Sequence, residues 1–423
     1  MSDEFFDFAS EQDLQDIFTS QIKQHLDNLK RNCTSLSDEL FISSGISRII
    51  SQNKTGRDFL QKSEEIFDIQ IPRSTFSDAM HSSRRRDLIR QVSCRNYKSL
   101  DQELISDKID YLHEFKEIEG HDVFSVDGHY IEHSSHTQRD LKGKLYASGN
   151  LYALNMRNGL MQHFACVSDG SEKNHEMPIF RERIKSFNTK KKTIWISDRG
   201  FIDYRWWGKQ AKKGDYVISR AKTNNSILYC GELSFDKNDP VNAGVVSNRL
   251  GNFTSSGSVM RIIEYIDPET AEQMTFYSTL GKDVRPGVVC WLYFLRWKIE
   301  KIFDCFKNSF EETKAWATGN KATEIQGYFI CLVYNFVQFL SEKTKKYESC
   351  EDEKAERKYA KNLESREKKA RELGRFIHPL LYTSRKISRI SCQFIRSVRN
   401  YFFSKKPLSF ILPIFAKRLK RYL

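Results

Sequence analysis

Four side chains with reactive or charged groups stand among large apolar residues in the stretch WLYFLRWKIEKIFDCFK, which begins at residue 291. They are Tyr293, Arg296, Glu300 and Lys307. At about 100° per residue they fall within an arc of roughly 60° on a helical wheel, beside an apolar stripe. We predict one amphipathic helix that buries the stripe and presents a carboxylate between cationic and phenolic groups. The alternative is a solvated helix edge on which Glu300 only pairs with Arg296.

Two further carboxylates follow β-rich runs. HDVFSVDGHY, from residue 121, arrives at Asp127, and the short apolar strand in KKTIWISDRGF ends at Asp198. The ends of strands are where α/β sheets place their chemistry. Converging carboxylates repel one another unless cations neutralise them, and Mg²⁺ prefers such oxygen ligands. Two such ions about 4 Å apart support phosphoryl transfer. Alternatively, each acid is an ordinary surface residue or cap, since the sequence alone does not show that they meet.

The pattern around these acids predicts the elements that position them. Alternating strands turn at Arg157, Asn158 and Gly159, and EMPIFRERIKSF reads as a helix. A further helix ends at Gly214 before another strand, and short strands joined by polar turns fill 222–282. Strands in a row, followed by alternating helices and strands, predict an α/β core with a β-rich insertion.

Composition narrows the class of protein. A chain of 423 residues can bury a large core and hold two or more domains. Its mean hydropathy is −0.58, and its longest apolar run, YFICLVYNFVQFL, is too short to span a bilayer. The start MSDEFFDFAS lacks the features of a secretory signal. Nine cysteines without a C-x-x-C pair favour reduced thiols in a cytoplasm, mostly as core residues, over disulfides or zinc.

The formal charge of +13 is concentrated near the C-terminus. Residues 341–423 hold 23 Lys and Arg against 9 Asp and Glu, and no acidic residue follows Glu372. Aromatic residues are interleaved with these cations, a pattern that suits the phosphates of a nucleic acid. An anionic membrane surface is the rival partner for FILPIFAKRLKRYL. We favour nucleic acid, because Pro413 is expected to interrupt an amphipathic helix there. The aromatic residues are Phe376, Phe394, Tyr401, Phe402 and Phe403.

A second basic cluster lies near the N-terminus. GRDFLQKSEEIFD, IQIPR and STFSDAMHSSRRRDLIRQV read as a helix, a short turn and a helix, with Ser74 or Thr75 as the cap of the second helix. Such a pair is typical of a helix-turn-helix-like DNA reader, although an arginine run is often only a solvated face. The candidate DNA-binding cations are Arg84, Arg85, Arg86 and Arg90.

Other polar clusters predict less. His129, His133 and His136 have spacings that a metal could use, but no cysteine or carboxylate set completes a zinc site. His175 and Glu176 lie where a loop could approach the site, although a solvated loop is the favoured interpretation. Arg199 is read as a DNA contact or an ion-pair partner. The sequence has no phosphate-binding loop of the G-x-x-x-x-G-K-[ST] type, so nucleotide hydrolysis is not expected.

Taken together, these motifs resemble the insertion-sequence-four family of DDE transposases. The spacing of the four polar residues named first matches the Y-R-E-K signature of that family. SVDGHYI around Asp127 and WISDRGF around Asp198 are similar to its first and second aspartate motifs, in the same order. The resemblance covers residues 115–345 well, and more loosely the N-terminal stretch ending STFSDAMHSSRRR.

The resemblance implies a ribonuclease-H-like mixed-sheet core with the β-rich insertion between the second aspartate and the glutamate. It implies that Asp127, Asp198 and Glu300 are the catalytic residues and bind two Mg²⁺ ions, with Mn²⁺ as a substitute. The implied organisation has a helical DNA-binding region, a catalytic core interrupted by the insertion, and a basic helical region for DNA contact or dimerisation. The boundaries are 1–115, 116–345 with the insertion at 222–282, and 346–423.

The resemblance also implies the partners. Tyr293, Arg296 and Lys307 would hold phosphates of the transposon end. A homodimer would cut DNA at paired terminal inverted repeats and join the 3′ ends to target DNA, in some members through a hairpin. The aromatic residue that some members place against a flipped base is not identified by the sequence. We expect a cytoplasmic, nucleoid-associated bacterial protein without a membrane partner.

Two alternatives of other classes remain open. One is a transposase-derived DNA-binding regulator that does not cut, against which the presence of all three acids argues. The other is a host nuclease for structured nucleic acid, which shares the chemistry and differs in substrate. Terminal inverted repeats flanked by short direct repeats around the gene would favour the transposase.

Overall fold

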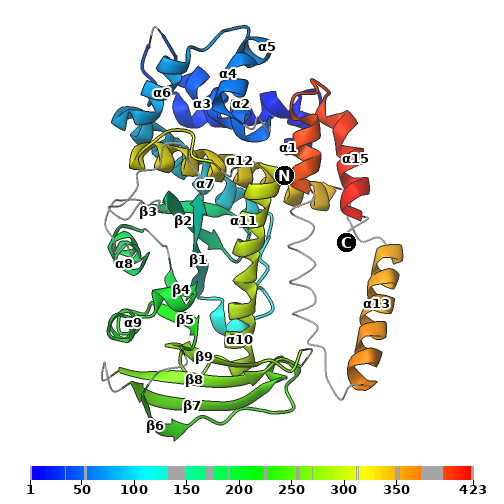
Figure 1. Cartoon of the computed structure of the whole chain (residues 1–423). Coiled ribbons are helices and arrows are strands. Elements are labelled where there is room, and N and C mark those ends of the chain that lie inside the picture. The colour runs from blue at the N-terminus through cyan, green and yellow to red at the C-terminus, as the bar shows by residue number, and fades with distance from the viewer. Residues whose placement is uncertain are drawn as a thin grey trace.

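One mixed β-sheet with helices on both faces forms the centre of the computed structural model (Figure 1). The sheet has nine strands in the order β3-β2-β1-β4-β5-β9-β8-β7-β6. The residues described are 2–33, 35–51, 55–131, 148–167, 176–187, 191–222, 226–253, 258–268, 270–310, 312, 314–347, 353–372 and 394–420.

The first five strands have the ribonuclease-H-like arrangement. β1 pairs antiparallel with β2, and β2 pairs antiparallel with β3, whereas β4 and β5 continue parallel to β1. The predicted turn between β2 and β3 is present, and Gly159 there has a φ of +76°, which glycine adopts without strain. The predicted fold class is therefore confirmed. The strands are β1 (His121–Ile131), β2 (Ser148–Asn155), β3 (Met161–Val167), β4 (Lys192–Ser197) and β5 (Tyr216–Arg220).

Four antiparallel strands separate β5 from the helices that follow. β9 pairs antiparallel with β5, and β8, β7 and β6 continue outward from it. The β-rich segment thus extends the central sheet and does not form a separate layer. The strands are β6 (Ile227–Glu232), β7 (Val245–Phe253), β8 (Ser258–Ile266) and β9 (Gln273–Ser278).

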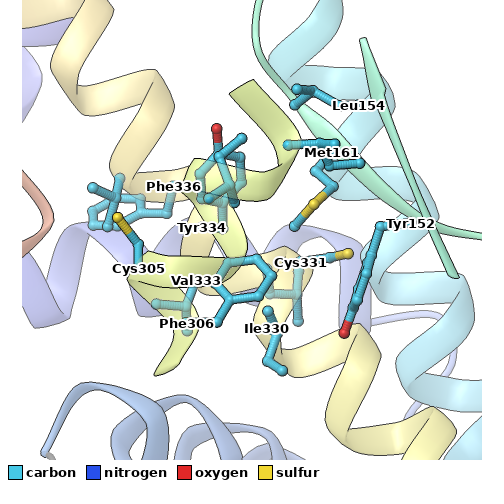
Figure 2. Close-up of a cluster of buried hydrophobic side chains, with 14 of the residues drawn as sticks. Tyr152, Leu154, Met161, Cys305, Phe306, Ile330, Cys331, Val333, Tyr334 and Phe336 are labelled. Atoms are coloured by element: carbon cyan, nitrogen blue, oxygen red, sulfur yellow. The ribbon is translucent and has the colours of Figure 1, made fainter. Parts of the chain in front are cut away.

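Two helical layers cover the sheet. On one face, α8 (Glu176–Ser186) and α9 (Tyr204–Ala211) bury Phe180 and Trp207 against the sheet. The other face is covered by α10 (Pro286–Leu295), α11 (Trp297–Ser309) and the long α12 (Asn320–Tyr347). Figure 2 shows the second layer, where side chains of α11 and α12 meet those of β2 and β3. This burial of large apolar side chains fixes the helices relative to the strands that carry the acids.

The N-terminal helices pack on the far side of α12. The break between α6 and α7 falls at Ser82, whose hydroxyl accepts from the N–H of Arg85 at 3.3 Å. The prediction of one helix capped by Ser74 or Thr75 is therefore wrong, because both residues lie inside α6, which Pro72 precedes. The helices are α1 (Ser2–Ala9), α2 (Leu14–Leu26), α3 (Asp38–Ile50), α4 (Gly56–Gln61), α5 (Ser63–Phe67), α6 (Arg73–His81) and α7 (Ser83–Ser106).

The C-terminal region is helical where it is described, in α13 (Glu353–Glu372), in residues 394–402 and in α15 (Leu408–Lys420). α15 passes through Pro413, contrary to the expected interruption. Ile411, Leu412 and Phe415, all at most 3% exposed, pack into the core around this proline and hold the helix.

The aromatic residues of the basic tail are mostly core residues. Phe394 and Phe402 are 2% and 1% exposed, and Tyr401 and Phe403 pack partly buried against the same core. Their interleaving with cations reflects an amphipathic pattern and not a set of stacking platforms for bases. Phe376 lies outside the described residues.

The cysteines follow the prediction only in part. Cys290 and Cys331 are buried free thiols, whereas Cys94 and Cys230 are free and exposed. Cys305 is disulfide-bonded, so the expectation of reduced thiols is wrong for this residue. Within the described ranges, no helix is long and apolar enough to cross a membrane.

Candidate active site

Asp127 lies in the middle of β1, where pairing with β4 has ended and pairing with β2 continues. β1 pairs with β4 only from His121 to Ser125, whereas Asp127 is opposite Tyr152 of β2. The prediction that Asp127 ends its strand is wrong, because β2 still pairs with β1 as far as Ile131. On the β4 side, the parallel ladder ends at Ser125, so Asp127 lies beyond the residues that pair with β4.

Asp198 follows β4 directly, as predicted, and caps the short helix η2 (Arg199–Phe201). Its carboxylate accepts from the N–H of Gly200 at 2.7 Å. Its backbone carbonyl accepts from the hydroxyl of Ser219 on β5 at 2.9 Å. Because β1 and β4 run parallel, these bonds hold Asp198 at the same end of the sheet as Asp127.

The segment with Tyr293 and Glu300 is not one helix. α10 ends at Leu295 and α11 begins at Trp297, one after the other in a single column (Figure 1). Arg296 between them keeps right-handed helical dihedrals, but the bonds on both sides of it span three residues instead of four. Because of this tightened turn, the residues after Arg296 do not keep the positions that the helical wheel predicts, although the chain continues in the same direction.

Arg296 connects two of the three predicted acids. Its Nη1 lies 3.0 Å from Oδ2 of Asp127, and its Nη2 lies 2.7 Å from Oε1 of Glu300. The guanidinium also lies over the ring of Tyr293, 5.3 Å from the centroid. Arg296 is only 6% exposed, so its contact with Asp127 is largely shielded from water, whereas the side chain of Glu300 is 40% exposed. Asp127 and Glu300 are thus brought to one place from opposite sides of a sheet–helix interface.

The electrostatics at Asp127 favour added positive charge. Burial raises the pKa of Asp127 to about 7, and the charges of Asp198 and Glu300 add to this shift against Arg296 and the N–H of Gly128. A carboxylate that keeps a proton near neutral pH has too little positive charge around it, and a hard divalent cation supplies that charge. As they stand, no three acidic, histidine or cysteine side chains of the described residues form a cage for a metal ion.

A family model described as a transposase DDE domain matches residues 118–336, which is more than half of the chain. The chain belongs to the DDE transposases. Among solved structures, a cryo-EM piggyBac transposase synaptic complex with hairpin DNA is similar with a TM-score of 0.34 and 11% sequence identity. That comparison covers 92% of this chain and 80% of the other. No curated protein matches the sequence.

Membership brings two general properties to the site. DDE transposases act on DNA, and they generally depend on divalent metal ions. The three acids fit such ions, because hard carboxylate oxygens are the ligands that these ions prefer and Asp127 is short of positive charge. The matched residues contain all three acids and all four residues of the 291–307 stretch.

The remaining predicted contacts of the transposase differ in accessibility. Tyr293 is 5% exposed, and its ring packs against the guanidinium of Arg296. Lys307, in contrast, is exposed in the last turn of α11. Trp291 is 7% exposed and packs against Phe115 with ring centroids 4.4 Å apart, so it is not available to a base. Arg199 is exposed beside Asp198.

The arginine run of the transposase is largely engaged in folding. Arg84 forms two bonds to the buried carboxylate of Asp38, at 2.5 and 2.8 Å. Arg85 is 7% exposed, donates to the carbonyl of Leu36 and lies over the ring of Phe41. These contacts argue against the predicted DNA contact for Arg84 and Arg85, because guanidinium groups held in this way are not free to meet phosphates.

Arg86 and Arg90 of the same run pair with partly exposed carboxylates and not with a buried one. Arg86 pairs with Asp87 at 3.0 Å and lies 3.8 Å from Glu324, and Arg90 lies 3.4 Å from Asp87. Their side chains are 29% and 41% exposed. DNA contact by this cluster therefore stays a prediction for these two residues.

Glu176 lies beside the predicted acids of the transposase, whereas the sequence favoured a solvated loop over an approach to the site. It is the first residue of α8, half-buried, and its Oε1 accepts from the hydroxyl of Tyr130 at 2.5 Å. Burial raises its pKa, and the charge of Asp198 raises it further against the bond from Tyr130. The signal in the sequence was that Glu176 is the first residue of a predicted helix that follows a strand of the same sheet.

The described histidines of the transposase do not belong to any group of side chains that could hold a metal ion. His129 is 3% exposed and packs against Phe303 and Phe306, and burial, with Lys307 nearby, lowers its pKa to about 4. His133, His136 and His175 lie outside the described residues.

Proposed function

We propose that this DDE transposase is a member of the insertion-sequence-four family that cuts DNA at the terminal inverted repeats of an insertion sequence. The 3′ ends are then joined to target DNA, in a cut-and-paste reaction that passes through a hairpin in some relatives. The observation that carries this proposal is the contact of Arg296 with Asp127 and Glu300. It supports a catalytic role for the Y-R-E-K segment, because a solvated helix edge would not join the helix to the first aspartate.

Asp127, Asp198 and Glu300 would hold the divalent ions, with Mg²⁺ as the physiological ion and Mn²⁺ as a substitute. When bound, the ions activate the attacking oxygen and stabilise the leaving one. In the structure Arg296 satisfies two of these acids. Bound ions would therefore compete with Arg296 for the carboxylates, and the guanidinium of Arg296 would then be available to a phosphate of the transposon end.

The other residues of the segment have supporting roles in this proposal. Tyr293 keeps the guanidinium of Arg296 over its ring, and exposed Lys307 meets the DNA backbone further along α11. Residues 1–115 would contact DNA through Arg86 and Arg90, and 346–423 would contact DNA or a second subunit. The active form would be a homodimer on two paired ends, acting on the nucleoid of a bacterial cytoplasm.

The test compares Glu300→Gln with the wild type on DNA that carries the element's end. The substitution keeps the size of the side chain and removes the charge that holds an ion, so nicking and joining in Mg²⁺ should fall to background. Binding of the end in a gel-shift assay should persist, because repulsion of phosphate is reduced. Asp304→Asn is the matched control, since Asp304 is exposed on the same helix and pairs only with Lys301 among the ion pairs of the described chain.

Three outcomes decide between the functions. Wild-type nicking by Glu300→Gln, or by the wild type in EDTA, would overturn the metal-dependent mechanism. A wild type that binds the ends but cuts no DNA with Mg²⁺ or Mn²⁺ would instead indicate a DNA-binding regulator. Cutting of branched DNA without any preference for the element's ends would indicate a host nuclease.

A further inference from the structure

The carboxylate of Glu176 lies between the chain segments that carry the two aspartates. On one side, its Oε1 accepts from the hydroxyl of Tyr130, three residues after Asp127 on β1. On the other side, Glu176 lies close enough to Asp198 for the charge of Asp198 to raise the pKa of Glu176. Glu176 therefore belongs to the same group of acids, although it comes from a different element, the first turn of α8.

Two glycines show how closely Glu176 packs. A Cβ added to Gly128, the residue after Asp127, would overlap with Oε1 of Glu176 and lie 2.9 Å from the ring of Tyr130. A Cβ added to Gly200, whose N–H donates to Asp198, would lie 3.5 Å from Oε2 of Glu176 and 3.0 Å from Oδ1 of Asp198. The two oxygens of Glu176 thus face different segments. Oε1 lies against Gly128, next to Asp127, and Oε2 lies near Gly200, two residues after Asp198.

The position of Glu176 is set by the packing of α8. Phe180 on the buried face of α8 meets Phe201 of η2, with ring centroids 5.3 Å apart and an edge-to-face arrangement. Arg181 of α8 pairs with Asp203, which caps α9. Because α8 is joined in this way to the segment that follows Asp198, the carboxylate at its N-terminus moves with that segment.

We propose that Glu176 is a positioning residue of the active site, whose carboxylate, held by Tyr130, sets the spacing of Asp127 and Asp198 and so strengthens divalent-ion binding. This inference rests on the proposed metal-dependent function. A fourth carboxylate brings the formal charge of the acids and Arg296 closer to that of two divalent ions. Residues around ligating carboxylates typically change metal affinity 10–100-fold when they are replaced.

The test measures Mn²⁺ binding to the full chain without DNA, by titration calorimetry. Glu176→Gln keeps the size of the side chain and an oxygen for the Tyr130 hydroxyl, so folding should persist and Mn²⁺ affinity should fall at least tenfold. Glu182→Gln on the same helix is the matched control, because Glu182 is exposed and pairs with Lys185. Its Mn²⁺ affinity should equal that of the wild type. Circular dichroism and thermal melting check that each variant is folded.

A steric variant tests the same position without removing the charge. Gly128→Ala introduces a methyl group where Oε1 of Glu176 lies, so the carboxylate must move and Mn²⁺ affinity should again fall. Gly120→Ala is its control, since a Cβ there meets no atom within 4 Å. The Mn²⁺ concentration for half-maximal nicking of end DNA gives a second readout, and it should rise for Glu176→Gln and Gly128→Ala only.

The outcomes separate this inference from the proposed function. If Asp198→Asn loses Mn²⁺ binding while folded Glu176→Gln binds and uses Mn²⁺ like the wild type, the role of Glu176 is overturned and the metal site stands. If Asp198→Asn also binds and uses Mn²⁺ like the wild type, the proposed metal site itself is overturned.

Discussion

Arg296 donates to Asp127 over 3.0 Å, although 169 residues separate them in the chain. The guanidinium is buried, and the same side chain reaches Glu300 one turn further along the helix. In the absence of other cations, Arg296 therefore supplies the positive charge for two acids whose mutual repulsion would otherwise be unopposed.

The first prediction follows from this role of Arg296, whose charge takes the place of a bound cation. Arg296→Ala should lower the free energy of unfolding of the metal-free protein by about 1.5 to 3 kcal/mol, the usual range for a hydrogen bond to a charged group. Added Mn²⁺ should recover more stability in the variant than in the wild type, because the ions no longer compete with Arg296. Urea denaturation with and without Mn²⁺ measures both effects.

Arg199→Ala is the control for that experiment. Arg199 is exposed beside Asp198, so its loss should change stability by no more than about 0.5 kcal/mol. An Arg296→Ala protein with wild-type stability, and with the same response to Mn²⁺, would mean that the observed contacts do not neutralise the acids.

The second prediction concerns the arginine run. Arg84→Ala leaves the carboxylate of Asp38, which is 1% exposed, without its main partner and should cost about 3 to 5 kcal/mol. Arg90→Ala should cost no more than about 0.5 kcal/mol, since Arg90 is 41% exposed. Chemical denaturation compares the two variants. Equal small losses would return Arg84 to the set of candidate DNA contacts.

The third prediction is a dependence of stability on pH. Burial, assisted by Arg183, lowers the pKa of His163 to about 3, so the folded protein keeps this imidazole neutral while the unfolded chain takes up a proton below about 6.5. Stability from this residue is complete above the unfolded pKa and is lost as the pH falls toward the folded pKa. His163 packs between Tyr152 and Tyr328 and bonds to Asn150.

His163→Gln keeps a donor for Asn150 and removes the titration. Between pH 7.5 and pH 5, the wild type should lose about 2 kcal/mol more than the variant, at 1.36 kcal/mol per pH unit below the unfolded pKa. Urea denaturation at the two pH values gives the difference. Parallel losses in both proteins would show that His163 takes up its proton in the folded state as well.

The fourth prediction compares a buried and an exposed aromatic residue of the C-terminal helix. Phe415→Ala removes a side chain that is fully buried and should cost about 3 to 5 kcal/mol. Phe410→Ala is the matched control on the same helix, because Phe410 is 51% exposed. Thermal unfolding ranks the two. Similar melting temperatures would mean that α15 is not part of the cooperative core.

The fifth prediction tests whether exposed cations of the same region meet DNA. Replacing Lys405 and Lys406 by Gln should make the slope of log affinity against log salt shallower by about 2, if each contacts one phosphate. Both residues are exposed, so the substitutions should leave folding intact. An unchanged slope in a gel-shift series would assign the region to assembly or packing. Deleting everything after Glu372 is a poorer test, because it removes Phe415 from the core as well.

The sequence predicted those features that depend on neighbours along the chain. The β-rich runs before Asp127 and Asp198 and the turn at Gly159 are local patterns of alternating polarity and turn residues, and they were read correctly. The placement of Asp127 within its strand was missed, because the end of a strand depends on how long its partner β2 continues to pair.

Contacts between distant residues were beyond the reach of sequence patterns. Arg84 was predicted to contact DNA, but its partner Asp38 lies 46 residues away. The bond from Tyr130 to Glu176 spans the same separation, and nothing near Glu176 in the sequence indicates it. The turn at Arg296 was missed for another reason, since Arg296 itself keeps helical dihedrals.

The pairing of the chain's two terminal regions has a consequence for biosynthesis. The N–H of Leu408 donates to the carbonyl of Gln12 at 2.8 Å, and Phe402 meets Phe18 with ring centroids 6.3 Å apart. During translation at about 5 to 20 residues per second, the first helices therefore wait roughly 20 to 80 s for these partners. Over that interval their apolar faces depend on chaperones or on transient contacts, and this part of the core closes only after residues 402–408 have been made.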